Sequence, residues 1–203
     1  MRKTPWLFLF ILVQPLFLSA EIYDLDYTAM DKEAEALYQE SSFIRLRPKD
    51  TPDGSLPIFL YNIEKTKNPH KIPESTFKDS LFLVEKGNLR FSAGDYQEAI
   101  SCYSQALELN PYLLAGLHNL GLAFFILGDY SQSIVNFKKV IDLQPFNGHP
   151  YFYLGWIYKR LENHLLAEHY LKVAKKIFQA QGELSLISQT EDLLATLQTM
   201  PQE

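Results

Sequence analysis

The stretch Gly94-Asp95-Tyr96-Gln97-Glu98-Ala99-Ile100 recurs further along the chain as Gly128-Asp129-Tyr130-Ser131-Gln132-Ser133-Ile134. Other positions recur at the same interval: Gly87, Gly121 and Gly155; Ala99, Ser133 and Ala167; Ala106, Val140 and Ala174; Pro111 and Pro145. A fixed period of about 34 residues is typical of stacked structural repeats, in which each unit packs on its neighbours. The sequence therefore predicts a repeat solenoid over about residues 80–181.

Each repeat has the pattern of two helices. In the second repeat the apolar stripe of the first helix is Leu117, Leu120, Gly121 and Phe124, at i, i+3, i+4 and i+7. The matching stripe on the next segment is Ser133, Phe137, Val140 and Ile141. Stripes with this spacing lie on one face of a helix. Because Gly121 and Ser133 are small, the two helices are expected to approach closely, so each repeat is predicted to be an antiparallel helix pair.

The turns between the predicted helices contain capping residues. Gly128 suits a left-handed C-terminal cap. Asp129, with Gln132 three residues later, is expected to cap the following helix, and Asp95 with Glu98 is expected to do the same in the first repeat. Prolines are tolerated where a helix begins, and one stands where each new pair is expected to start.

These residues resemble a known family. The pattern Leu120-Gly121, Phe124, Gly128-Asp129-Tyr130, Phe137 and Pro145 is similar to the tetratricopeptide repeat (TPR). The resemblance implies an all-α solenoid of antiparallel helix pairs that binds other proteins. The expected divisions are a signal peptide (1–20), an N-terminal region (21–79), three repeats (80–113, 114–147 and 148–181) and a C-terminal capping helix and tail (182–203).

The third copy differs at its turn and at its end. It has Glu162-Asn163-His164 in place of Gly-Asp-Tyr, and Asn163 remains a suitable helix cap. Gln179 stands where the earlier copies have proline, so the helix is predicted to continue to about Gln181. A last amphipathic helix from about Ser185 to Thr199 is expected to cover the final pair, as the end of a solenoid requires.

The first twenty residues have the pattern of an export signal. Arg2-Lys3 precede an apolar run, Trp6–Leu18, and Ala20 is a small residue at the expected cleavage position. The run is shorter than the roughly 20 residues of an ordinary membrane span. We therefore predict export to a bacterial periplasm, as is common for TPR proteins with a signal sequence. The alternative is an uncleaved anchor at residues 6–18 that holds the protein on the membrane, facing the periplasm.

The segment between the signal and the repeats is less regular. A stripe of Tyr27, Met30, Ala34, Leu37 and Ile44 predicts an amphipathic helix from about Thr28 to Arg45. Pro57 to Lys67 contains a short apolar run that fits either a helix or a strand. Ser75 or Thr76 is expected to cap the first repeat helix.

The composition indicates a binding protein rather than an enzyme. The net charge of −5 disfavours nucleic-acid binding, which depends on basic surface. Cys102 is the only cysteine, and no nucleophile–base pair is visible around it. His164 and His169 are five residues apart and cannot chelate a metal from one helix face, whereas His118 and His149 are expected to share a surface without a third ligand. We predict no enzymatic activity, no metal and no cofactor.

The first helices of the repeats define a predicted concave groove. Its binding residues are Val84, Asn88, Phe91, His118, Asn119, Leu122, Phe125, Phe152, Trp156 and Lys159. In one well-known type of TPR, asparagines and basic residues clamp a carboxylate. Asn88 and Asn119 match those asparagines, but Val84, His149 and Tyr153 stand where the basic residues belong, which disfavours a clamp.

An apolar, aromatic groove suits an amphipathic or hydrophobic protein segment. Burial of the groove by another part of the chain is the alternative, with the Thr28–Arg45 helix as the predicted cover. The sequence thus predicts an exported TPR adaptor that binds a protein or peptide. The competing hypothesis is a membrane-tethered structural subunit of an envelope complex.

Overall fold

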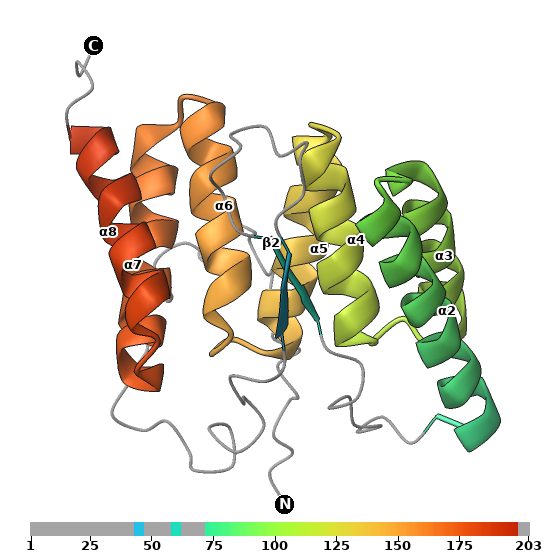
Figure 1. Cartoon of the computed structure of the whole chain (residues 1–203). Helices are drawn as coiled ribbons and strands as arrows, with labels where there is room; N and C mark the ends of the chain where they lie inside the picture. The colour runs from blue at the N-terminus through green and yellow to red at the C-terminus, as the bar shows by residue number, and fades with distance from the viewer. Residues whose placement is uncertain (1–42, 47–57, 62–71, 199–203) are drawn as a thin grey trace, which may run out of the picture. The chain divides into compact units, whose positions relative to one another are not determined.

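The computed structural model describes residues 43–46, 58–61 and 72–198. The helices of this part are α2 (Glu74–Ala93), α3 (Tyr96–Leu109), α4 (Leu114–Ile126), α5 (Tyr130–Leu143), α6 (Gly148–Arg160), α7 (His164–Gln181) and α8 (Leu184–Gln198). Each helix packs against the next one in the chain, from α2 on α3 to α7 on α8 (Figure 1). The predicted all-α solenoid of antiparallel helix pairs is therefore confirmed.

Close contact within each pair depends on glycine. A Cβ atom added to Gly121 of α4 would lie 3.1 Å from Cε1 of Phe137 on α5. Beside it, the Ser133 hydroxyl donates a hydrogen bond of 2.8 Å to the Gly121 carbonyl. The helix faces predicted for the second repeat are thus correct, and the small residues let the two backbones approach as expected.

The turn after each first helix has a left-handed residue. Gly94 and Gly128 have φ values of 87° and 79°, which suit glycine because it lacks a Cβ atom. Glu162 occupies the corresponding place in the third copy with a φ of 59°. The predicted left-handed cap at Gly128 is confirmed, and the third turn keeps this backbone conformation without a glycine.

Among the helix caps predicted within the repeats, two are correct and one is not. Asp129 accepts a hydrogen bond of 3.1 Å from the backbone N–H of Gln132, and Asn163 accepts one of 3.1 Å from Leu166. Asp95 precedes α3, but its side chain makes no capping bond. Its carboxylate instead lies 3.5 Å from the Arg90 guanidinium. The capping box predicted for Asp95 was wrong because this carboxylate has an ion-pair partner on α2.

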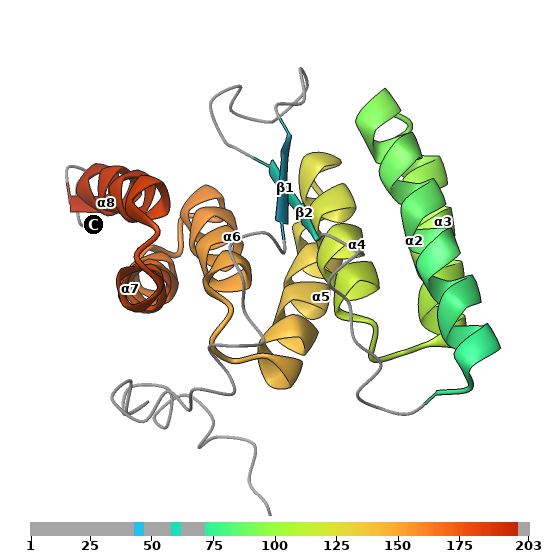
Figure 2. The same ribbon diagram turned by 60° about the horizontal axis from the view of Figure 1, so that its bottom comes forward.

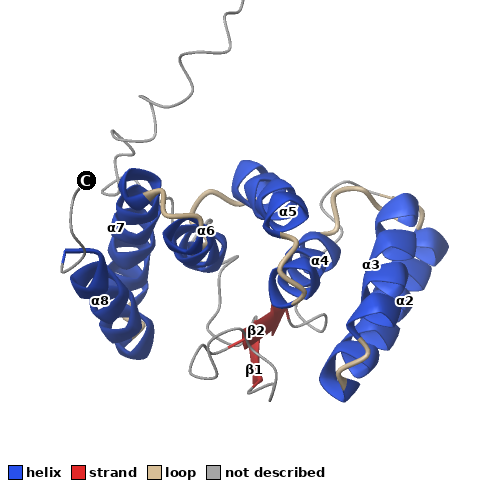
Figure 3. Cartoon of the chain, turned by 90° about the horizontal axis from the view of Figure 1, so that it is seen from above, coloured by secondary structure: helices blue, strands red, loops and turns tan. Residues whose placement is uncertain are grey.

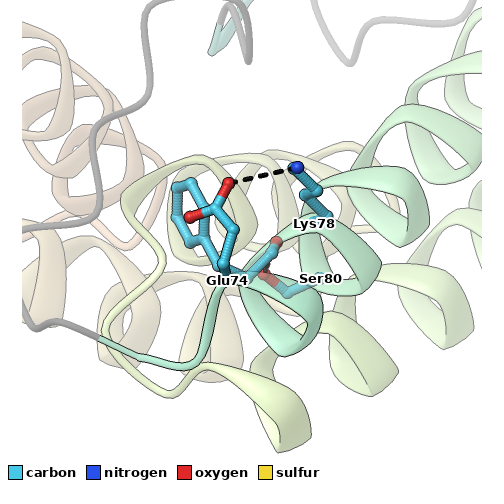
Figure 4. A network of polar contacts seen from close by, with 4 residues as sticks. Glu74, Lys78 and Ser80 are labelled. Carbon is cyan, nitrogen blue, oxygen red and sulfur yellow. Dashed lines mark hydrogen bonds and ion pairs between the residues drawn. The ribbon is translucent and has the colours of Figure 1, made fainter.

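The start of α2 also differs from the prediction. Pro73, not Ser75 or Thr76, precedes the first turn, and its carbonyl accepts a hydrogen bond of 2.9 Å from Phe77 N–H. Ser80 donates to the Phe77 carbonyl at 2.7 Å, and Glu74 pairs with Lys78 at 3.4 Å (Figure 4). Because Pro73 itself holds the N-cap position, Ser75 and Thr76 fall inside the first turn, where their side chains do not cap the helix.

The inter-repeat prolines lie slightly outside the helices. Pro111 and Pro145 are in the turns that precede Leu114 of α4 and Gly148 of α6. They therefore lie where one pair ends and the next begins, as expected, three residues before the next helix starts.

The C-terminal prediction is confirmed. The helix α7 continues to Gln181, Gly182 follows with a φ of 74°, and α8 packs on α7. An ion pair of 2.8 Å between Lys175 of α7 and Glu191 of α8 joins the two helices. None of the helices in the described part of the chain is long and apolar enough to span a bilayer, and residues 6–18 lie outside that part.

Two short strands precede the helices. β1 (Phe43–Leu46) pairs antiparallel with β2 (Ile58–Tyr61), so that Phe43 faces Tyr61. The strand option for the 57–67 segment is therefore correct at its start. The helix predicted from Thr28 lies outside the described residues as far as residue 42. The last three residues of the predicted helix, 43–45, belong to β1 instead, so the C-terminal end of that prediction was wrong. Aromatic and β-branched residues such as Phe43 and Ile44 favour the paired, extended conformation.

The hairpin lies against the helices. β2 runs alongside α4 (Figure 2). This contact places β2 next to the first helix of the middle repeat, which carries part of the predicted groove.

Candidate functional site

The predicted groove residues come from the first helix of each repeat, as expected. α2 supplies Val84, Asn88 and Phe91; α4 supplies His118, Asn119, Leu122 and Phe125; α6 supplies Phe152, Trp156 and Lys159. The six large apolar members, Val84, Phe91, Leu122, Phe125, Phe152 and Trp156, are each at most 2% exposed. The structure therefore presents no open apolar groove at these positions, and their role in binding stays a prediction.

Part of this burial comes from contacts between repeats. The Trp156 ring lies edge-on to Phe125, with 4.7 Å between the ring centroids, so α6 packs on α4 through these two side chains. Phe125 also lies 5.6 Å from Tyr153. The Arg160 guanidinium lies over the Trp156 ring, 5.4 Å from the centroid. The cation above the aromatic face stabilises the tryptophan in this position.

The strand β2 lies beside α4 (Figure 3). The groove residues of α4, Leu122 and Phe125, are fully buried. The helix expected as the cover, Thr28–Arg45, lies outside the described residues up to residue 42, so that prediction stays untested. The only sequence signal for the strand at Ile58–Tyr61 was the short apolar run.

The two asparagines of the predicted groove form one polar cluster. Oδ1 of Asn88 accepts hydrogen bonds of 2.8 Å from Tyr103 Oη and 2.8 Å from Asn119 Nδ2. Burial raises the pKa of Tyr103, which keeps its hydroxyl protonated and able to donate. Because both bonds meet on one oxygen, Asn88 joins α3 and α4 to α2. Tyr103 was not predicted as a member of this cluster.

The histidines of the second and third repeats also lie together. His118 and His149 are buried, and their ring centroids are 6.3 Å apart. Phe137 packs edge-on to His118, and Phe178 packs edge-on to His149. Burial, and secondly the charge of His118, hold the pKa of His149 well below its usual range. The two residues were predicted to share a surface; they share the interior because aromatic rings enclose them.

Lys159 lies at the edge of the predicted groove. Its Nζ donates a hydrogen bond of 2.7 Å to the hydroxyl of Thr196 on α8. The capping helix thus reaches the groove edge as well as covering α7. Among the described residues, no group of three His, Cys, Asp or Glu side chains could hold a metal ion.

Family models match the repeats directly. A "TPR repeat" model matches residues 87–128, and a "Tetratricopeptide repeat" model matches residues 114–147. The chain is a TPR protein. TPR units typically mediate protein–protein interaction, so the coarse function is that of an interaction scaffold. None of the curated proteins matches this chain in sequence.

Solved structures show the same fold. The type III secretion translocator chaperone SycD of Yersinia enterocolitica has a TM-score of 0.58 and 16% identity, over 64% of this chain and 88% of that chain. A type III secretion complex from Aeromonas hydrophila has a TM-score of 0.58 and 19% identity, over 64% and 85%. The TPR2B domain of yeast Sti1 has a TM-score of 0.55 and 16% identity, over 62% and 98%. At these identities the likeness concerns the fold alone.

Proposed function

We propose that this TPR protein is an exported scaffold that holds a protein or peptide partner through an amphipathic or hydrophobic segment. In the resting state its own N-terminal hairpin lies at the groove, and the partner takes the place of the hairpin. The main support is the burial of the groove side chains of α4, together with the position of β2 alongside α4.

The hairpin is suited to displacement. Each strand has four residues, and the described sheet contains two strands. A two-stranded hairpin of this length is marginally stable by itself in water. Removing it from α4 would leave the helix pairs intact, because their contacts with one another do not involve the strands. A partner segment that buries the same apolar side chains would compensate for the loss.

The fold neighbours are consistent with a protein partner. The yeast Sti1 domain was solved in a complex with pHsp70, and SycD is described as a translocator chaperone. Peptide or protein capture by the TPR groove is therefore the function class that we propose for this chain. The negative net charge and apolar groove positions favour an apolar segment over a strongly acidic one.

The proposed location is the bacterial periplasm, with cleavage after Ala20. This rests on the basic start and the short apolar run at Trp6–Leu18. The second candidate, a membrane-tethered structural subunit of an envelope complex, rests on the same run if it is retained. Sequencing of the N-terminus of the native protein separates the two. A chain that starts at Glu21 supports export, whereas one that starts at Met1 in membranes supports the tether.

Cross-linking in the native envelope tests the scaffold function. The parent protein is expected to capture a specific protein, and Leu122→Asp, which places a charge in the groove of α4, is expected to lose it. The matched control is Val135→Asp on α5, whose side chain is exposed and should be neutral for capture. Circular dichroism must show that both variants remain helical. Capture that survives Leu122→Asp but fails with Val135→Asp would contradict groove binding.

A further inference from the structure

The outward side of α2 is apolar and open. Phe82 is 66% exposed and Leu89 is 70% exposed. They are seven residues apart, so they lie one above the other on the same side of the helix, and Ser75 lies seven residues before Phe82. We call the surface formed by Ser75, Phe82 and Leu89 the α2 outer face.

The repeat register shows what this face corresponds to. Gly116 and Ala123 occupy the positions of Phe82 and Leu89 on α4, one repeat later, and both are buried. A Cβ atom on Gly116 would lie 3.0 Å from Leu107 of the preceding pair. The α2 outer face is therefore the place where a preceding helix pair would pack. Phe82 is far larger than Gly116, so whatever packs on this face must lie farther from α2 than α3 lies from α4.

The opposite end of the solenoid is different. The exposed side chains of α8 are Leu184 at its first residue, Ser185, Ser188, Glu191, Asp192, Ala195 and Thr196. Most of these are polar or small, as expected for an end that faces water. The two ends therefore have different chemistry, and the α2 outer face is the end that is built for contact.

Charged side chains of both signs lie beside this face. At 100° per residue, Lys78 and Glu85 lie on one flank of the stripe, and Asp79 and Lys86 lie on the other. All four are exposed. The Lys78 ammonium pairs with Glu74 of the same helix at 3.4 Å, with both side chains at the surface (Figure 4).

Symmetry decides which flanks would meet. In a parallel two-fold pair of helices, unlike flanks face each other, so Lys78 would meet Asp79 of the second copy and Glu85 would meet its Lys86. In the antiparallel two-fold pair that brings Phe82 of one copy against Leu89 of the other, like flanks face each other, so Glu85 would meet Glu85 and Lys86 would meet Lys86. Flanking charges of this kind set the partner and orientation in helix pairs. Of the two arrangements that bring Phe82 and Leu89 of both copies into contact, only the parallel pair places opposite charges together.

We propose that the α2 outer face binds a second copy of this chain, with the two α2 helices parallel and Phe82 and Leu89 of each copy in contact. Such an interface is isologous, with the same surface on both subunits. It leaves the groove positions of both copies on other sides of their helices.

Sedimentation velocity of the full chain over a concentration series tests the proposal. The parent is expected to dimerise, and Phe82→Ser/Leu89→Ser is expected to weaken the dimer at least about tenfold, since two apolar contacts are lost from each copy. The matched control is Leu165→Ser on α7, which removes a side chain that is 82% exposed. It should leave the dimer unchanged. A parent that stays monomeric overturns the proposal, and so does a dimer that the double variant does not weaken.

Two further variants test the parallel orientation. Glu85→Lys should weaken the dimer, and Glu85→Lys/Lys86→Glu should restore it, because the swap exchanges the charges of both flanks. In Ser75→Cys, oxidation should link the two copies at residue 75, whereas Cys102 is buried and should not react. An antiparallel pair centred between Phe82 and Leu89 would hold the two positions roughly 30 Å apart, at about 1.5 Å per residue. A dimer without rescue and without this disulfide contradicts the parallel pair.

If the parent is monomeric and the double serine variant lowers its stability, another segment of the same chain covers the face. If the parent is monomeric and equally stable with the serines, the face is simply exposed. Both results overturn the proposal.

Discussion

Replacing Gly121 by leucine tests the assignment of the helix-pair interface. The added Cβ atom alone would lie 3.1 to 3.3 Å from three ring atoms of Phe137. That ring cannot move away easily, because it stacks on Tyr153 with 5.2 Å between centroids and a 9° interplanar angle. His118 packs against its edge. The rest of the leucine side chain therefore has no space on α4.

The expected cost follows from this geometry. Overpacking of a filled core costs about 1–3 kcal/mol. Leucine has a better helix propensity than glycine by about 0.8–1 kcal/mol, which offsets part of the cost. Because the Phe137 ring cannot move aside, the cost should lie in the upper part of that range, so for Gly121→Leu we expect a net loss of about 1–2 kcal/mol. In a domain of this size that corresponds to a fall in Tm of roughly 2–8 °C. Stacked repeats share interfaces, so the loss should affect the α4–α5 pair and its neighbours.

Urea denaturation followed by circular dichroism measures the effect. The matched control is Ala180→Leu, an exposed position on α7 that gains a leucine without a neighbour to displace. We expect the control to stay within about 0.5 kcal/mol of the parent. A Gly121→Leu midpoint equal to that of the parent would refute the helix-pair register.

Three other results are expected. First, Asp129→Ala should lose about 1 kcal/mol of stability in a urea melt, whereas Asp95→Ala should lose less because Asp95 makes no capping bond; equal losses would contradict this difference. Second, stability should fall as pH drops below about 6.5, by up to about 1.4 kcal/mol per pH unit, because the unfolded chain gains a proton at His149 that the folded chain excludes. Above that pH both states hold His149 neutral, so His149→Gln should flatten the profile only on the acid side, and an unchanged slope would count against a buried neutral imidazole. Third, the native N-terminus should be Glu21; recovery of Met1 would instead favour the membrane tether.

Local sequence was sufficient to predict the helix pairs. Gly121, Ser133 and Phe137 belong to one repeat, and their roles depend on neighbours within that repeat. The αL turn at Gly128 and the cap at Asp129 are similarly local. The capping box at Asp95 could not be excluded from the pattern, because it is the long side chain of Arg90 that engages the carboxylate.

Long-range contacts were beyond the sequence pattern. Ile58–Tyr61 is a short apolar run, and such a run does not distinguish a strand from a buried helix segment. Its pairing with Phe43–Leu46, and its position beside α4, depend on residues that are distant in the sequence. The same holds for Lys159, whose partner Thr196 belongs to a different helix pair. The groove side chains could be identified from the repeat register, but not their burial.

Closure of the groove by the N-terminal part of the chain can be measured at Trp156. The chain has two tryptophans, Trp6 and Trp156, so Trp6→Phe leaves Trp156 as the single tryptophan reporter, in the groove. Acrylamide quenching of this variant is then compared with and without residues 21–72, with circular dichroism to verify that the helices remain. Because Trp156 is buried in the full chain, we predict weak quenching there. After the deletion we predict quenching that is at least severalfold stronger. Equal quenching in two equally helical proteins would show that the helices bury Trp156 by themselves and would contradict a groove closed by the N-terminal segment.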